Sequence, residues 1–317
     1  MYIGFYSHYE VLNKNMIFTN PFHACGDNSC YPMIYLARHL KNIGHKICTI
    51  DLEYTLEKFD AIIFRDLPKL EDIYFLYLLE RKFDNLYLLI NECEVILPDN
   101  WDVKNHACFK KILTWHDRWV DNIKYFKFHT PVKVPPKVEF DLGQKNKFCT
   151  MIQSGDKFNF HPLSLQFERR KAIRWFEQNH PEDFDLYGYR WDNTYPSHRG
   201  SVNTKREVMQ RYRFSICYEN ARDLPGYITE KIFDCFFAGN VPIYWGPPNI
   251  TPYIPAETYI DKTNFKSYEE LYKYLKGMPE AEYVGYLDAI KRYVTGDRIY
   301  RFTPQAFANT IMELLGI

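Results

Sequence analysis

The N-terminal part of the chain alternates short apolar runs with segments in which apolar residues recur at helical spacing. Apolar runs bounded by turn residues are typical of buried strands, whereas helical spacing predicts amphipathic helices. The runs predict strands at residues 1–6, 45–51, 59–64, 86–90 and 111–114. The helical spacing predicts helices at residues 31–40 and 71–79. Such alternation predicts an open α/β sheet.

A second series of strands and helices follows a stretch rich in proline and lysine, residues 132–147. Because that composition is typical of a linker, we expect two domains, residues 1–140 and 141–317. We expect the last helix to pack back on the first domain. The second domain is predicted to hold strands at 148–154, 214–218 and 241–245, and helices at 168–179, 268–276, 279–293 and 306–315.

Residues 214–246 combine a strand, a polar loop, a helix and a second strand. Thr229 stands at the N-cap position of this helix, and Gly239 ends it. The order is that of a βαβ unit, in which ligands bind where strand ends meet helix starts. We therefore expect the main binding site at the start of this helix.

Glu230 and Lys231 are the first residues of that helix. A lysine in the first turn opposes the helix dipole, so an anionic ligand explains it well. A phosphate held by Lys231 and the free backbone N–H groups leaves Glu230 to accept hydrogen bonds from a diol such as a ribose. The alternative is a capped helix with a solvated Glu–Lys pair.

Acidic residues follow the predicted strand at 86–90 directly. Carboxylates at the carboxyl end of a strand face the crevice of an open sheet. Glu92 and Glu94 are therefore candidates for a general base. Paired acids that serve only as solvated turn residues are the alternative.

A basic cluster, Arg169, Arg170 and Lys171, lies at the start of the predicted helix 168–179. Cations at a helix start are unfavourable unless they have an anionic partner. An arginine fork grips two phosphate oxygens better than a lysine does. A basic solvated face is the alternative.

The sequence Asp183-Phe184-Asp185 has the spelling of a D-x-D metal motif. It begins a predicted strand rather than ending one, so we interpret it as structural. We find no other histidine, cysteine and aspartate cluster with metal-ligand spacing. We therefore expect no obligatory metal, and a divalent ion that is at most stimulatory.

Charge and cysteine content narrow the class of protein. Lysine plus arginine and aspartate plus glutamate both total 40, so no global field recruits nucleic acid, and we expect no nucleic-acid partner. The eight cysteines form no C-x-x-C pair, which favours a reducing cytoplasm; Cys25 and Cys30 are the pair that a secreted chain would join.

No stretch approaches the ~20 apolar residues of a membrane span. We expect a cytoplasmic protein without a transmembrane segment, peripheral at a membrane only through its acceptor.

Three motifs follow one another in the second half of the chain. They are Y-x-F-x-I-C-x-E-N at 212–220, G-Y-I-T-E-K-I at 226–232 and P-I-Y-W-G at 242–246. In this order and spacing they resemble the α1,3/α1,4-fucosyltransferase family, glycosyltransferase family 10, in its soluble bacterial or viral form. The resemblance implies a GT-B fold, with two Rossmann-like domains that face each other across a cleft and bind acceptor and donor respectively.

The resemblance also implies the reaction, an inverting transfer of L-fucose from GDP-β-L-fucose to a glycan hydroxyl. The acceptor is expected to contain N-acetylglucosamine and to belong to a glycoprotein or lipopolysaccharide pathway, with an α1,3 linkage. Glu92 matches the place of the catalytic base, and Glu94 remains the alternative.

For the donor, the resemblance implies that Arg170 and Lys231 neutralise the charge on the leaving GDP. Glu230 is expected to hold the ribose. Asn220 and Tyr227 are expected to line the fucose and nucleotide pocket.

One departure from the family pattern concerns the loop at residues 221–225, which is longer and more charged than in many members. Transfer of another GDP-sugar is therefore an alternative. A non-catalytic protein that binds glycan or nucleotide is a second one. Acceptor, linkage and oligomeric state stay open.

Overall fold

The computed structural model describes residues 1–22, 27–155 and 159–317. It divides the chain into two compact units, residues 1–133 together with 300–317, and residues 134–299. The predicted division placed the boundary after residue 140 and the whole C-terminus in the second domain. The structure instead groups residues 300–317 with the first unit, because the last helix packs there against the helix at Tyr31–Asn42, in line with the expectation that it packs back on the first domain.

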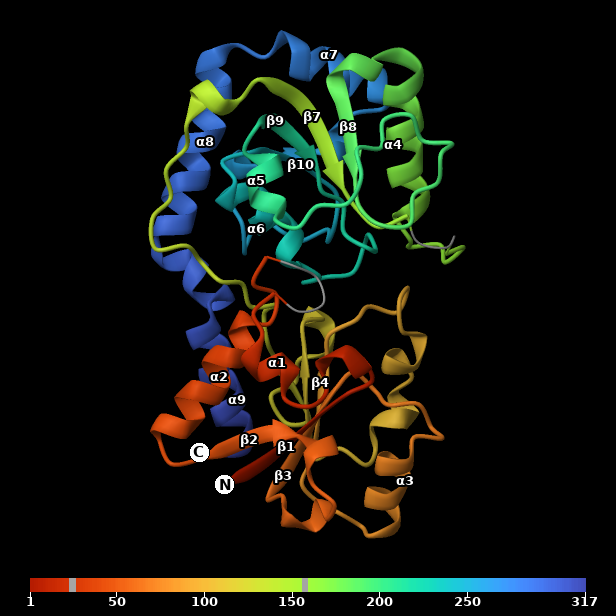
Figure 1. Cartoon of the computed structure of the whole chain (residues 1–317), viewed down its shortest axis with the longest axis vertical. Coiled ribbons are helices and arrows are strands. Elements are labelled where there is room, and N and C mark those ends of the chain that lie inside the picture. The colour runs from red at the N-terminus through yellow and green to blue at the C-terminus, as the bar shows by residue number, and fades with distance from the viewer. Residues whose placement is uncertain (23–26, 156–158) are drawn as a thin grey trace. The chain divides into compact units, whose positions relative to one another are not determined.

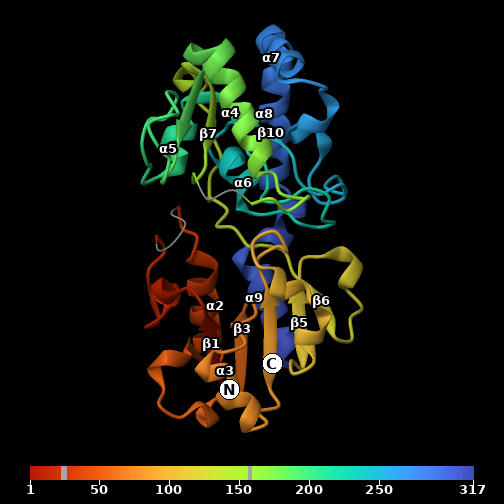
Figure 2. The same cartoon turned by 90° about the vertical axis from the view of Figure 1, so that its right-hand side faces the viewer.

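The first unit contains a six-stranded, fully parallel sheet in the order β2-β1-β3-β4-β5-β6 (Figures 1 and 2). Its strands are β1 (Tyr2–Ser7), β2 (Lys46–Thr49), β3 (Ala61–Arg65), β4 (Leu86–Ile90), β5 (Lys111–Thr114) and β6 (Tyr125–Lys127). The strand order reverses between β1 and β3. At such a switch point, ligands of open α/β sheets bind outside the carboxyl ends of the strands.

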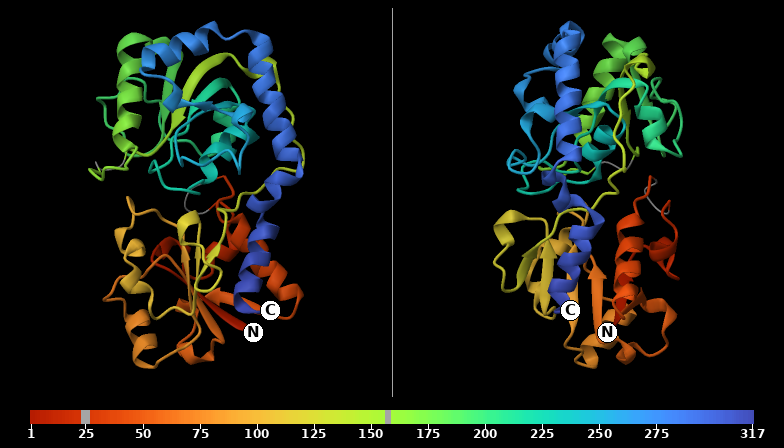
Figure 3. Two further views of the ribbon diagram at one scale, coloured as in Figure 1. Left: turned by 180° about the vertical axis from the view of Figure 1, so that it is seen from behind. Right: turned by 90° about the vertical axis from the view of Figure 1, so that its left-hand side faces the viewer.

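Helices cover both faces of this sheet. They are α1 (Met16–Thr19), α2 (Tyr31–Asn42), α3 (Ile73–Glu80) and α9 (Pro304–Leu315). Within the first unit α9 packs beside α2, and α3 lies on the opposite face (Figures 1 and 3). The rings of Phe64, Phe75 and Phe109 pack together between the sheet and α3, with centroids 5.5–5.9 Å apart.

The second unit contains a five-stranded parallel sheet in the order β11-β10-β9-β7-β8. Its strands are β7 (Lys147–Ile152), β8 (Phe184–Tyr187), β9 (Tyr212–Ile216), β10 (Val241–Tyr244) and β11 (Ile260–Asp261). Its helices are α4 (Gln166–Asn179), α5 (Lys205–Met209), α6 (Glu230–Phe237), α7 (Tyr268–Gly277) and α8 (Glu280–Thr295). The two parallel sheets with their helices confirm the predicted α/β class.

Three local predictions need correction or qualification. The stretch between β1 and α2, in which the sequence analysis named no helix, contains the short helix α1. Strand β6 was not predicted, because its three residues are half-buried and form no apolar run. Cys25 lies outside the described residues, and the seven cysteines within them are free thiols.

Among the described residues, no helix combines the length and the apolar character that crossing a membrane requires.

Candidate functional site

The site that the sequence singled out begins at the end of β9 in the second unit. β9 is buried, and the chain leaves it through Tyr218, Glu219 and Asn220 before it returns at Thr229 to start α6. Parallel pairing of β9 with β10 places both carboxyl ends at the same edge of the sheet. The start of α6 lies at this edge, as the βαβ pattern predicted.

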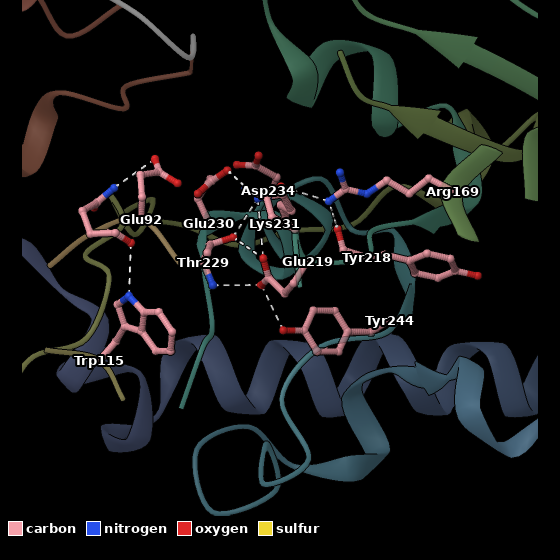
Figure 4. A network of polar contacts seen from close by, with 12 residues as sticks. Glu92, Trp115, Arg169, Tyr218, Glu219, Thr229, Glu230, Lys231, Asp234 and Tyr244 are labelled. Carbon is pink, nitrogen blue, oxygen red and sulfur yellow. Dashed lines mark hydrogen bonds and ion pairs between the residues drawn. The ribbon is translucent and has the colours of Figure 1, made fainter. Parts of the chain in front are cut away.

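Glu219 is the buried centre of this edge (Figure 4). Its side chain is 0% exposed. The carboxylate accepts hydrogen bonds from the Thr229 N–H at 2.9 Å, the Thr229 hydroxyl at 2.6 Å and the Tyr244 hydroxyl at 3.0 Å. Burial and the neighbouring Glu219 carboxylate raise the pKa of Tyr244 well above its ordinary value, so the tyrosine remains a donor. A buried carboxylate with this many donors is held in one position.

Thr229 occupies the predicted N-cap position of α6, but its side chain does not cap the helix. The hydroxyl donates to Glu219 instead, and it accepts a hydrogen bond from the Lys231 Nζ at 3.0 Å. The expected capping bond is therefore replaced by a link between the end of β9 and the first turn of α6.

Lys231 lies between two carboxylates. Its Nζ is 3.5 Å from Glu219 Oε2 and 3.5 Å from Glu230 Oε1, and its side chain is 19% exposed. Burial alone would lower the pKa of Lys231, but Glu230 and Glu219 outweigh burial and raise it. The lysine is thus a fixed cation in the first turn of α6, where backbone N–H groups also attract anions.

Glu230 is the more accessible of the two carboxylates, with a side chain that is 39% exposed. Burial works against its charge, but Lys231 and Lys205 outweigh it and lower the pKa of Glu230 to about 2. Glu230 is therefore an acceptor-only carboxylate at neutral pH, as a role with a diol requires.

Arg169, which the sequence analysis left within a basic cluster, reaches this edge from α4. It is 3% exposed, and its Nη2 donates to the Tyr218 carbonyl at 2.6 Å and to Asn220 Oδ1 at 3.2 Å. Its positive charge opposes the rise in the pKa of Lys231 that the two carboxylates cause. The structure thus brings Arg169 and Asn220 together beside Lys231.

Arg170 lies elsewhere on α4, with its guanidinium 5.6 Å from the ring centroid of Trp191. The helix begins at Gln166, two residues before the predicted start, so the arginines lie later in the helix than expected. The helical phase distinguishes them, because Arg169 is three, four and seven residues before the buried Ala172, Ile173 and Phe176. That spacing was available in the sequence.

We expect Arg169→Lys to weaken GDP binding by about tenfold or more, because a lysine cannot reproduce the fork of donors. Arg170→Lys is the matched control, since it makes the same change one residue along the same helix. Calorimetric titration of each variant with GDP measures the difference. A larger loss of GDP affinity in the Arg170 variant would show that Arg170, as the sequence suggested, is the arginine that binds the phosphates.

Tyr227 is buried in the loop before α6, where its N–H donates to the Leu224 carbonyl at 3.1 Å. The loop is anchored by a hydrogen bond from the Gly226 N–H to Asn249 Oδ1 at 2.9 Å. Gly226 has φ +84°, a conformation that glycine adopts without strain. Tyr227 therefore belongs to the packed base of this loop.

Burial, rather than distance, should decide how much each acid stabilises the second unit. We expect Glu219→Gln to lower the free energy of unfolding by about 3 kcal/mol, because it leaves Lys231 without its buried partner and turns an amide N–H toward Thr229. Glu230→Gln makes the same change at the same 3.5 Å distance from Lys231, but the Glu230 side chain is 39% exposed, and the change should cost about 1 kcal/mol or less. Urea unfolding measures both; equal losses would contradict this account.

Glu92 lies in the first unit, directly after β4 and beside Asn91 (Figure 4). Its side chain is half-buried, and Asn91 Nδ2 is 3.4 Å from its Oε1. Glu94 is two residues further, in a turn. Both acids follow the carboxyl end of a parallel strand, as predicted.

Within the described ranges, one group of side chains has atoms close enough to hold a metal ion. His180, Glu182 and Asp183 place their ligand atoms within 4.8 Å of one another. The sequence analysis did not expect such a cluster and considered only the D-x-D spelling. Asp183 already accepts the Tyr272 hydroxyl at 2.6 Å and pairs with Lys276 at 2.7 Å.

The second aspartate of that spelling, Asp185, pairs with Lys147 and Arg199, each at 2.6 Å. These ion pairs lower the pKa of Asp185 despite its partial burial, which opposes the charge. Both aspartates of the motif therefore have structural partners.

Comparisons with known proteins bear on this region. Residues 144–301 match the family model described as "Glycosyltransferase family 10 (fucosyltransferase) C-term". Alpha-(1,3)-fucosyltransferase FucT of Helicobacter pylori is 36% identical over 76 residues, 24% of this chain and 16% of the relative. The 4-galactosyl-N-acetylglucosaminide 3-alpha-L-fucosyltransferase 9 of Mus musculus is 44% identical over 79 residues, 24% of this chain and 22% of the relative. The chain thus spans well under half the length of these relatives.

Solved structures share the fold at low identity. A crystal structure of an α1,3-fucosyltransferase with GDP has a TM-score of 0.56 and 14% identity, covering 96% of this chain and 93% of the other. The T4 phage BGT in complex with UDP and Mn²⁺ has a TM-score of 0.58 and 12% identity, covering 100% of both chains. At this identity the likeness shows the fold alone, the GT-B type that the motifs implied.

Proposed function

Through residues 144–301 the chain belongs to glycosyltransferase family 10, and we propose that it transfers L-fucose from GDP-β-L-fucose to a hydroxyl group of a glycan. The observation that carries the proposal is Lys231, a fixed cation in the first turn of α6, within the matched region. A nucleoside diphosphate is the ligand chemistry that such a helix start, with an arginine nearby, binds well.

The donor would lie against the start of α6 in the second unit. Lys231 takes the phosphates, together with an arginine from α4, for which Arg169 is better placed than Arg170. Glu230 accepts hydrogen bonds from the ribose diol. Asn220, which already accepts a bond from Arg169, contributes to the sugar side of the pocket, with Tyr227 in the supporting loop.

The reaction is a single displacement. The acceptor oxygen forms a bond to the anomeric carbon of fucose while the bond from that carbon to the β-phosphate oxygen breaks. Glu92 takes the acceptor proton, and GDP leaves with the electron pair. Lys231 and the arginine stabilise the charge that develops on GDP, so we propose that no metal ion is obligatory.

The names of relatives support the acceptor and linkage. The mouse relative is named for transfer to the 3-position of an N-acetylglucosaminide that carries galactose. We propose an N-acetylglucosamine-containing glycan and an α1,3 linkage for this chain too. The zero formal net charge favours a carbohydrate over a nucleic acid as acceptor.

The test is a transfer assay with purified protein, GDP-fucose and an N-acetyllactosamine acceptor, with GDP-mannose and UDP-glucose as competing donors. Mass spectrometry should detect a fucosylated product, and NMR should show an α-anomeric linkage, as inversion of the β-donor requires. Transfer from GDP-mannose but not from GDP-fucose would show that the chain uses a GDP-sugar other than GDP-fucose. Binding of GDP without turnover of any donor would favour the non-catalytic alternative.

A further inference from the structure

The backbone of Asn91 and Glu92 is held at all four of its polar atoms. Asp66 Oδ1 accepts the N–H of Asn91 at 2.7 Å and the N–H of Glu92 at 2.8 Å. The indole of Trp115 donates to the Asn91 carbonyl at 3.1 Å (Figure 4), and the indole of Trp101 donates to the Glu92 carbonyl at 3.1 Å. Three side chains from three other segments thus fix the dipeptide that follows β4.

Asp66 combines complete burial of a carboxylate with a left-handed backbone conformation. It follows β3, the neighbour of β4 in the sheet, and it is 0% exposed. Its backbone has φ +64°, in the left-handed region that non-glycine residues seldom occupy and that aspartate and asparagine tolerate best. Strain of this kind persists where the surrounding structure over-determines a position, and it concentrates at functional sites.

A second side chain reinforces this carboxylate. Asn100 Nδ2 donates to Asp66 Oδ1 at 2.8 Å, while Asn100 Oδ1 accepts the Leu67 N–H at 2.7 Å. Asn100 Nδ2 also lies 3.3 Å from the Glu92 carbonyl. Asn100 is itself fully buried, so the segment after β3 and the segment after β4 are joined through one amide.

We propose that Asp66 is the positioning residue for Glu92, and that Trp101 and Trp115 complete its hold on the base. The inference rests on the proposed function, in which Glu92 removes the acceptor proton. Asp66 accepts hydrogen bonds from the two amides, and the indoles donate hydrogen bonds to the two carbonyls. The backbone of Glu92 therefore cannot shift without breaking several hydrogen bonds. Misplacing a general base by about 1 Å lowers the rate of catalysis on the order of 10²-fold. Holding the backbone of Glu92 in place therefore serves catalysis as well as folding.

Asp66→Gly tests the proposal, because it removes the oxygen that accepts both amides, and glycine adopts the left-handed backbone without strain. We expect kcat for transfer to fall by about 10²-fold, with the affinity for GDP unchanged, because the donor residues lie in the other unit. Asp72→Gly is the matched control. The Asp72 carboxylate also accepts two backbone amides, at the start of α3, and its loss should lower stability but leave kcat unchanged.

A second pair of variants tests the carbonyl side. Trp115→Phe removes the bond to Asn91 and should lower kcat measurably. Trp119→Phe removes the same indole from the same aromatic cluster, where Trp119 packs 4.6 Å from Trp101 between ring centroids. It should leave kcat near the wild-type value. If Asp66→Gly does not fold, this pair decides the proposal: equal rates in the two phenylalanine variants overturn it.

The decisive readout is a double-mutant cycle. In a Glu92→Gln background there is no base to position, so Asp66→Gly should cause no further loss of residual transfer in long single-turnover incubations. Losses that multiply would show a merely structural role and overturn the proposal. Near-wild-type transfer by Glu92→Gln alone would instead reject Glu92 as the base, which is a failure of the proposed function and is seen before the cycle is closed.

Discussion

Replacing Lys231 by alanine should lower the rate of transfer by about 10²–10³-fold, because the charge that develops on the leaving diphosphate loses its fixed partner. The structure gives the reason for so large an effect. Lys231 is positioned by Thr229 at 3.0 Å and by two carboxylates at 3.5 Å, so it stabilises the transition state without reorganisation. Steady-state kinetics with GDP-fucose measure the loss as a fall in kcat/KM, because Lys231 contributes both to binding of the diphosphate and to the transition state.

The same substitution leaves Glu219 buried without its cation, so a loss of folding must be separated from a loss of chemistry. The double variant Lys231→Ala with Glu219→Gln removes that buried charge and should recover stability without recovering rate. Lys205→Ala is a matched control, because Lys205 pairs with Asp234 of the same helix at 2.8 Å. Its rate of transfer should fall at most about tenfold, because Lys205 is paired with Asp234 and acts on the site only through the charge of Glu230. Turnover near the wild-type rate in Lys231→Ala would remove the phosphate role.

Replacing Glu92 by glutamine should lower transfer by about 10²–10⁴-fold while GDP binding is preserved. The amide has the shape of the carboxylate but cannot accept the acceptor proton. The affinity for GDP should not change, because the proposed donor residues belong to the second unit and Glu92 to the first. Transfer assays and calorimetry on the same preparation measure both quantities.

Glu94→Gln is the matched control for this prediction, with the same change two residues along the chain. It should transfer near the wild-type rate, because the bonds from Asp66, Trp101 and Trp115 act on Glu92 and the residue before it. A loss in the Glu94 variant with an active Glu92 variant would move the base by two residues.

The strands were predictable wherever burial on both faces leaves a continuous apolar run. Strands β4 and β5 have the predicted bounds, since parallel strands covered by helices on both sides carry few polar residues. β6 lacks such a run, and its place at the edge of the sheet is set by pairing with β5. The helix α6 was likewise predictable, because its apolar face repeats at helical spacing.

Site residues were predictable where a charged side chain stands at the start of a predicted helix or directly after a predicted strand. Glu230 and Lys231 stand next to each other at a helix start, and Glu92 follows a strand. Glu219 and Asp66 follow strands too, but what makes them important is complete burial and bonds to distant residues, which no local pattern records. Their position within three residues of the end of a buried strand was the available signal.

Calorimetric titration with GDP and with UDP, without added metal and with EDTA present, tests the central claim most directly. Solved structures of this fold hold either nucleotide, so the fold does not decide between them. The account predicts selective binding of GDP in EDTA, lost in Lys231→Ala. Binding of UDP in preference to GDP, or of neither nucleotide until a divalent metal is added, would contradict it.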